Sequence, residues 1–208
     1  MKKTKISYGR YLYLMISLIL IGAGTAIFIS TDLGASPMNV MSQGLSRTCG
    51  MNVGTASNLF QAFFFIIALL WDRRYMGASS IFSIFIIGFT IDITNHFLDP
   101  ILLPAPFIIR LLSCLIAPVI IGIGLVMLQH SETGMIPNDM IPMLIFDHTN
   151  KLSFQTIRVL YDVTQLSIGI LFGGVFGIGT LIAACLQGPC IQFAQTIIKQ
   201  PRSTLTSS

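Results

Sequence analysis

Residues 11–31 read YLYLMISLILIGAGTAIFIST, a run of 21 positions without a charged side chain. An α-helix rises about 1.5 Å per residue, so this run is long enough to span the roughly 30 Å hydrocarbon core of a bilayer. The apolar segment of a secretory signal peptide has only about 7–15 residues, and here further apolar runs follow. Residues 11–31 are therefore predicted to form a first transmembrane helix that is not cleaved.

The composition of the whole chain agrees with a membrane protein. Of 208 residues, 53% are hydrophobic and 10% are charged, whereas a soluble domain carries roughly 25% charged residues. The charged residues are too few to cover a water-exposed surface. The mean hydropathy of +0.80 also indicates a membrane protein. Disordered chains are poor in apolar residues, which excludes disorder as well. The class that remains is an all-α polytopic membrane protein with almost no extramembrane domain.

Further uncharged runs predict the other spans. The run over residues 163–198 has 36 positions, too many for one helix, and the glycines at 173, 174 and 177 predict a turn near its middle. Together the runs predict about six transmembrane helices, at residues 11–31, 53–71, 77–97, 108–129, 154–173 and 177–198.

The basic residues support six spans. Cytoplasmic loops of membrane proteins carry an excess of Lys and Arg. With the N-terminus inside, nine basic residues face the cytoplasm, and only Arg47 and Arg110 face outside. Both termini, including a tail at residues 201–208, are therefore predicted to be cytoplasmic. Because the charges flank the spans, the net charge of +4 does not indicate a nucleic-acid partner.

Two stretches, residues 36–46 and 137–147, are too short to cross the membrane. Ser36 and Pro37 form a good helix start, with Ser as the cap and Pro at the first helical position. Both stretches are predicted to be short or re-entrant helices. The predicted helix-break positions are Gly34, Ser36, Pro37, Gly88, Gly134, Pro137, Gly188 and Pro189.

An internal repeat is predicted from glycines that recur 100 positions apart. Chance would align about one such pair, but five align: Gly22 with Gly122, Gly24 with Gly124, Gly34 with Gly134, Gly77 with Gly177, and Gly88 with Gly188. Residues 1–105 and 106–200 are then two repeats of three spans and one short helix each. An odd number of spans inverts the second repeat in the bilayer. Inverted repeats are typical of secondary transporters, although duplication also builds symmetric scaffolds.

Several motifs resemble a known family. The stretches LGASPMNV at 33–40, QGLS at 43–46, VGTAS at 53–57, PND at 137–139 and GIGT at 177–180 are similar to those of YczE/YitT-like bacterial integral membrane proteins. The resemblance implies a multi-pass protein of the bacterial cytoplasmic membrane and assigns no substrate. Met38 and Asn39 replace the Trp-Asp usual in the family, so the first half lacks a carboxylate that the motif normally carries.

Charged residues inside a predicted span are the first candidates for chemistry. A charge in a span costs about 2.5–3.5 kcal/mol on insertion scales, so it normally faces a partner or a wet cavity. Arg158 and Asp162 are four positions apart and share a helix face. They form either a substrate or proton site or a structural pair. The equivalent positions of the first half are uncharged, so Asn58 and Gln61 would contribute amides to any shared site.

Other polar residues complete the predicted pathway. Asp139, whose equivalent is Asn39, follows Pro137 at a helix start and is either a plain cap or a cation or proton ligand facing Arg158. Asp92 and its equivalent Gln192 lie late in their spans, at the membrane edge or in the pathway.

No enzyme is expected. No nucleophile is paired with a base, and no metal-ligand spacing or cofactor motif is present in the sequence. The expected partners are the lipid bilayer, a small solute and, as a possibility left open by the small size of each half, a second copy in a homodimer. Two functions stay open: a small secondary transporter or permease for a small polar or amphiphilic solute, or a membrane scaffold that binds a partner complex.

Overall fold

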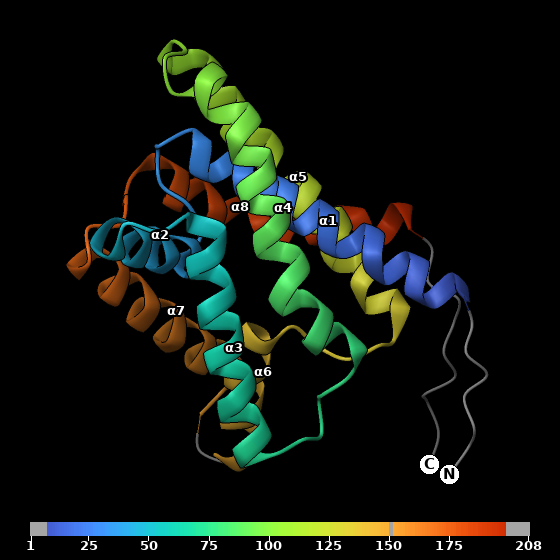
Figure 1. The fold of residues 1–208 in the computed structure, drawn as a ribbon. Coiled ribbons are helices and arrows are strands. Elements are labelled where there is room, and N and C mark those ends of the chain that lie inside the picture. Colours follow the sequence, from blue (N-terminus) through green and yellow to red (C-terminus); the bar gives the residue numbers. More distant parts are fainter. Residues whose placement is uncertain (1–7, 150–151, 199–208) are drawn as a thin grey trace.

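The computed structural model describes residues 8–149 and 152–198, and within them it contains eight α-helices and no strand (Figure 1). The predicted tail at residues 201–208 lies outside the described residues. The helices are α1 (Tyr8–Ser30), α2 (Pro37–Cys49), α3 (Val53–Trp71), α4 (Ala78–Leu102), α5 (Phe107–Ser131), α6 (Pro137–His148), α7 (Phe154–Leu171) and α8 (Ile178–Ile197).

A helix lies at each of the six predicted spans, and a shorter helix lies at both short stretches. Four helices, α1, α3, α4 and α5, are long and apolar enough to cross a membrane. The helices α7 and α8 are more polar, because α7 carries an Arg and an Asp and α8 carries three Gln residues. The count of six membrane crossings therefore stays a prediction.

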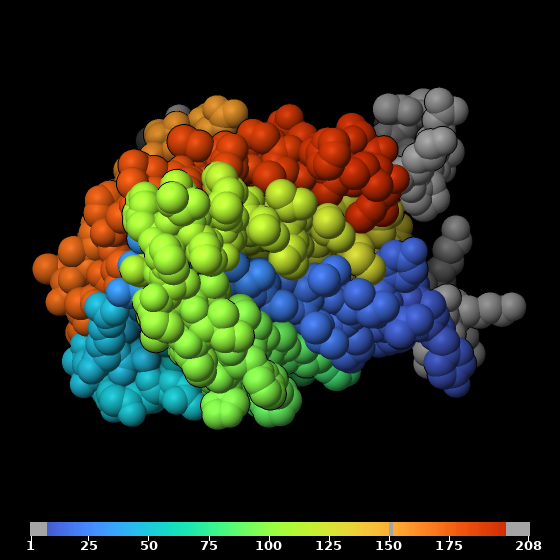
Figure 2. Space-filling model, turned by 90° about the horizontal axis from the view of Figure 1, so that it is seen from above, coloured from blue at the N-terminus to red at the C-terminus, as the bar shows by residue number. Residues whose placement is uncertain are grey.

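The helices form two groups. The first group contains α4, α1, α5 and α8, in which α1 packs against α4 and α5, and α5 packs against α8. Seen from above, α8, α5 and α1 lie side by side in that order (Figure 2). The second group contains α2, α3, α6 and α7, in which α2 packs on α7 and α3 packs on α6. The α3–α4 pair joins the two groups.

Small residues allow α1 and α5 to approach closely at the centre of the first group. A Cβ added to Gly24 would lie 2.7 Å from the Ile121 side chain, and one added to Gly124 would lie 2.8 Å from that of Ile21. Larger side chains at either glycine would push the two helices apart. Beside this crossing, buried Leu14, Leu18 and Ile91 fill the space between α1 and α4.

The chain leaves α1 and α5 through turns of the same shape. Asp32 and Glu132 have φ values of 48° and 47°, and Gly34 and Gly134 have φ values of 102° and 110°. These left-handed conformations end a helix and are readily adopted by glycine. As predicted, Ser36 occupies the cap position of α2 and Pro37 its first helical position, although the Ser36 side chain makes no capping hydrogen bond.

The helices α4 and α8 are not broken at the predicted positions, Gly88 and Gly188–Pro189, because both run without interruption through these residues. Gly88 instead permits α3 to lie against α4, since an added Cβ would overlap Asn58 Oδ1 and the carbonyl oxygen of Gly54. Gly188 has no comparable neighbour: an added Cβ there would meet nothing within 4 Å.

Candidate functional site

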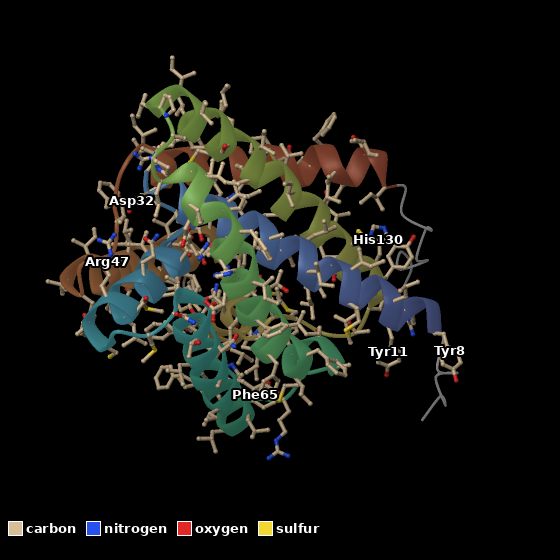
Figure 3. The ribbon with its side chains drawn as sticks, turned by 45° about the horizontal axis from the view of Figure 1, so that its top comes forward. Tyr8, Tyr11, Asp32, Arg47, Phe65 and His130 are labelled. Carbon is tan, nitrogen blue, oxygen red and sulfur yellow. The ribbon has the colours of Figure 1, made fainter. Side chains whose placement is uncertain are left out.

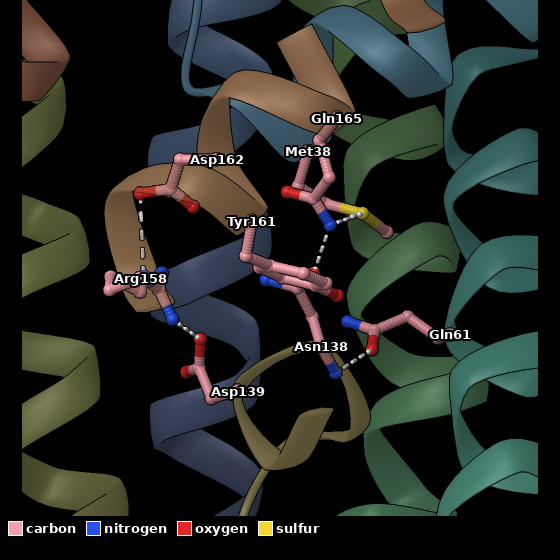
Figure 4. A network of polar contacts seen from close by, with 8 residues as sticks. All are labelled: Met38, Gln61, Asn138, Asp139, Arg158, Tyr161, Asp162 and Gln165. Carbon is pink, nitrogen blue, oxygen red and sulfur yellow. Dashed lines mark hydrogen bonds and ion pairs between the residues drawn. The ribbon is translucent and has the colours of Figure 1, made fainter. Parts of the chain in front are cut away.

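A network of polar side chains joins the second group of helices (Figure 4). It contains side chains from α2, α3, α6 and α7, so both halves of the chain contribute. Its members are Met38, Gln61, Asn138, Asp139, Arg158, Tyr161, Asp162 and Gln165. The first turn of α6 lies at its centre, facing α3 on one side and α7 on the other.

Three charged side chains form one end of the network. Arg158 donates from Nη1 to Asp139 Oδ1 at 2.9 Å, and its Nε lies 3.4 Å from Asp162 Oδ2. The predicted Arg158–Asp162 pair is thus present, and Asp139 is a third member of the cluster. The cap position of α6 is occupied by Ile136 rather than by Asp139. The three side chains are 37%, 33% and 31% exposed for Arg158, Asp139 and Asp162, so the cluster is only partly covered by the protein.

Asn138, in the first turn of α6, makes the uncharged contacts of the network. Its Oδ1 accepts hydrogen bonds from Tyr161 Oη at 3.0 Å and from Gln165 Nε2 at 2.6 Å. Its backbone N–H, one of the unpaired donors at the start of α6, donates to Gln61 Oε1 at 3.3 Å. Gln61 of the first half therefore caps a helix of the second half. Gln165 Nε2 also lies 3.9 Å from the sulfur of Met38 at the start of α2.

Sequence reasoning missed four members: Met38, Asn138, Tyr161 and Gln165. Two signals were available to find them. Tyr161 is the equivalent of Gln61 at the 100-residue shift, and Gln165 lies two turns after Arg158 on the same face of α7.

The remaining predicted site residues lie outside this network. Asp92 Oδ1 accepts from the Gly54 N–H at 2.7 Å and Oδ2 accepts from Thr55 Oγ1 at 3.2 Å, so Asp92 of α4 caps the start of α3. Gln192 is exposed. Asn39 and Asn58 are largely buried, and Oδ1 of Asn58 has no hydrogen-bond partner in the described structure.

Other charged residues tie helix ends together. Arg47 of α2 contacts Asp32 and the Gly173 carbonyl oxygen, at the opposite end of the molecule from Tyr8 and His130 (Figure 3). In addition, Arg10 pairs with Glu132. These contacts are exposed, and those of Arg10 with Glu132 and of Arg47 with Gly173 join elements that are distant in the sequence. Such contacts are typical of structural ion pairs.

A third polar contact connects the loop before α4 to the end of α6. Tyr75 donates to Asp147 Oδ2 at 2.7 Å, and Arg74 donates to the same oxygen at 3.0 Å. The hydrogen bond to Asp147, together with burial and the nearby negative charge, raises the pKa of the Tyr75 phenol. Among the residues that the structure describes, no group of three His, Cys, Asp or Glu side chains is placed to hold a metal ion.

Sequence comparison finds three bacterial relatives of the chain, one of which is named a membrane protein. It is 27% identical over 186 residues to the "Uncharacterized membrane protein YczE" of Bacillus subtilis, covering 89% of this chain and 85% of the relative. It is also 27% identical to the B. subtilis protein YyaS, covering 92% of this chain and 94% of YyaS. An uncharacterized Haemophilus influenzae protein is 27% identical, covering 89% and 83%. No solved structure matches the chain.

These relatives confirm the resemblance to YczE-like proteins, and together with the apolar helices they identify a helical membrane protein. A family model described as "Family of unknown function (DUF6198)" matches residues 8–196, nearly the whole chain. The protein therefore belongs to the DUF6198 family.

Proposed function

We propose that the protein is a small secondary transporter of the bacterial cytoplasmic membrane that binds a small polar or amphiphilic solute at the polar network. In this proposal the chain crosses the bilayer six times as two inverted repeats, residues 1–105 and 106–200. The observation that carries it is the charged cluster of Arg158, Asp139 and Asp162, since charged residues within membrane helices mark substrate and ion pathways.

Equivalent contacts between the halves support the repeat. The Ser79 N–H donates to the Thr133 carbonyl at 3.2 Å, and the Gly179 N–H donates to the Leu33 carbonyl at 2.8 Å. These two hydrogen bonds are related by the 100-residue shift, each joining one half to the other. The matching φ values before α2 and α6 and the reciprocal glycine contacts of α1 and α5 follow the same shift.

The two short helices support the position of the site. In inverted-repeat transporters the substrate lies between the repeats, next to discontinuous helices. Here Gln165 contacts Asn138 at the start of α6 and Met38 at the start of α2. Both helix starts thus lie in one network that is built from both halves.

A difference between the halves supports movement. Since α3 packs on α4 whereas α7 makes almost no contact with α8 over residues 154–197, the two repeats adopt two different arrangements of equivalent helices. An exchange of these arrangements between the repeats would open the site alternately to the two sides of the membrane, as alternating access requires.

Proteoliposomes test the transport proposal against a whole mixture of solutes at once. Vesicles containing the purified protein would be incubated with a pooled bacterial metabolite extract, and their contents measured by mass spectrometry. The control is a variant with all three charges neutralised, Arg158→Gln, Asp139→Asn and Asp162→Asn. We expect at least one solute to accumulate with the wild type and not with the control. Equal contents in both samples would contradict transport and favour the scaffold.

A reporter fused after Ser208 tests the six crossings. Alkaline phosphatase is active outside the cytoplasm, whereas green fluorescent protein folds inside it. We expect fluorescence and little phosphatase activity. Strong phosphatase activity would mean an odd number of crossings and would contradict the inverted repeat.

A further inference from the structure

We propose that the solute is a small organic cation with N–H donors, such as a primary ammonium or a guanidinium, held by Asp139, Asp162 and Gln165. This inference rests on the transporter proposed above, and it follows from the charge of the network and from the hydrogen-bonding groups that the protein leaves unpaired.

The charge of the network favours a cation. Two carboxylates face one guanidinium, so the cluster carries a formal charge of −1. In the described part of the chain, Arg158 is the basic residue that pairs with Asp139 or Asp162. The positive end of the α6 dipole offsets about half a charge at most, and Gln61 already occupies the Asn138 N–H there. A monovalent cation would neutralise the site, whereas an anion would add to its charge.

The hydrogen-bonding groups favour a donor. Tyr161 Oη and Gln165 Nε2 both donate hydrogen bonds to Asn138 Oδ1. Gln165 itself is 3% exposed, and its Oε1 is buried without a partner in the described structure. Leaving such an acceptor unpaired destabilises the empty site, and a ligand N–H would supply the missing hydrogen bond. An acceptor-rich solute such as a carboxylate would leave this oxygen unpaired.

Gln165 and Asp162 come from neighbouring turns of the same helix. Gln165 follows Asp162 by three positions, so both side chains leave neighbouring parts of the same face of α7. In Figure 4 the Gln165 amide oxygen points toward the side on which Asp162 lies, with Tyr161 between them. The Tyr161 ring packs against that of Phe64, with the ring centroids 6.0 Å apart.

Arg158 itself indicates how a cation binds. Its guanidinium shows that a planar cation fits between the two carboxylates. The contact to Asp162 is the longer one, 3.4 Å against 2.9 Å to Asp139. An incoming cation would therefore displace Arg158 from Asp162 first, while Arg158 keeps its partner on α6.

A set of matched probes tests the solute class on the purified full-length protein. The probes are 2-phenylethylammonium, neutral 2-phenylethanol, anionic 3-phenylpropionate, and the trimethylated ammonium, which has no N–H donor. A ligand that binds only the folded state raises the Tm. We expect the ammonium probe to raise it, the trimethylated form to bind roughly ten-fold more weakly for lack of hydrogen bonds, and the other two to have no effect.

Two variants locate the binding site. Asp162→Asn keeps the Arg158–Asp139 pair and should weaken the binding of the ammonium probe roughly ten-fold. Asp72→Asn, the same change in a loop outside the network, should leave its binding unchanged. Gln165→Met provides a second variant at the site if Asp162→Asn lowers the folded yield.

Three results would overturn the inference: a larger shift with the anionic or neutral probe, equal binding of the trimethylated form, or an unchanged ammonium response in both site variants. The transport assay tests the transporter proposal independently of the binding experiment. Uptake of an anionic solute would overturn the cation inference and leave the transporter intact. Ammonium binding at the network without uptake of any solute would overturn the transporter proposal and leave the cation inference intact.

Discussion

The helix pairs α3–α4 and α7–α8 correspond to each other at the 100-residue shift, yet only the first pair packs closely. Asn58 of α3 fits against Gly88 of α4. Its equivalent on α7 is Arg158, which turns away from Gly188 and pairs with Asp139 of α6. A long charged side chain does not fit the space that Asn58 fills. The change from Asn58 to Arg158 accompanies the separation of α7 from α8. The charged cluster also needs Asp139 and Asp162, whose counterparts Asn39 and Ala62 are uncharged.

The helix caps differ in the same way. Asp92 of α4 binds the start of α3, whereas the equivalent Gln192 of α8 is exposed and Ser153 caps α7 locally by accepting from the Thr156 N–H at 3.2 Å. The first pair is therefore fixed by a contact between helices, and the second pair lacks that contact.

The largest expected effect distinguishes the alanine substitutions at Gly88 and Gly188. Gly88→Ala inserts a Cβ into Asn58 and the Gly54 carbonyl, and such overpacking should cost about 3 kcal/mol and lower the Tm by roughly 6 °C or more. Gly188→Ala meets open space and should change the free energy of unfolding by less than about 1 kcal/mol, helped by the helix propensity of alanine. Thermal unfolding in detergent measures both. Equal losses would show that α7 and α8 also pack closely.

The next effect concerns the charges that distinguish the second half. Arg158→Leu leaves two carboxylates without a partner and should cost about 2 kcal/mol, less than for a fully buried pair because the groups are a third exposed. The double change Arg158→Leu/Asp162→Leu should recover only part of this, since Asp139 stays unpaired. Adding Asp139→Leu should recover most of it. Folded yield and Tm of the three variants check the order, and full recovery in the double variant would exclude Asp139 from the cluster.

A smaller effect is expected for the helix caps. Asp92→Ala removes the acceptor for the Gly54 N–H and should cost about 1–2 kcal/mol, as for other helix caps. Gln192→Ala should change stability by less than about 0.5 kcal/mol, as is usual for surface positions. Differential scanning fluorimetry of the two variants measures both changes in stability. A similar loss in both would mean that Gln192 caps α7 in a populated arrangement.

The smallest effect lies in a contact outside the spans. Tyr75→Phe removes the hydrogen bond to Asp147 and should cost about 1 kcal/mol. Because the folded state raises the pKa of Tyr75, this contribution is complete below the unfolded value of about 10 and declines as the pH rises above it. The Tm difference between wild type and variant should be constant from about pH 7 to 9 and shrink above about pH 10. A difference that grows above pH 10 would contradict the raised pKa.

Much of the helix pattern was predictable from the sequence. The helix at residues 53–71 has the predicted bounds, and the other five long helices differ from theirs by a few residues. Apolar run length and the glycine and proline positions are local properties, and they fix where helices begin and end. The charged residues of the candidate site were also visible locally, because Arg158 and Asp162 are four positions apart on one helix.

The sequence by itself determined the class of the protein, the position of its helices and the presence of charge within α7. Only the tertiary structure decided that Arg158 pairs with Asp139, that Gln61 caps α6 and that Asp92 caps α3. It also decided that Gly88 is a packing contact whereas Gly188 faces open space. The physical reason is distance along the chain. The residues in these contacts are 19 to 77 positions apart in the sequence. Hydropathy and residue spacing describe each helix by itself and do not specify which helix faces pack together.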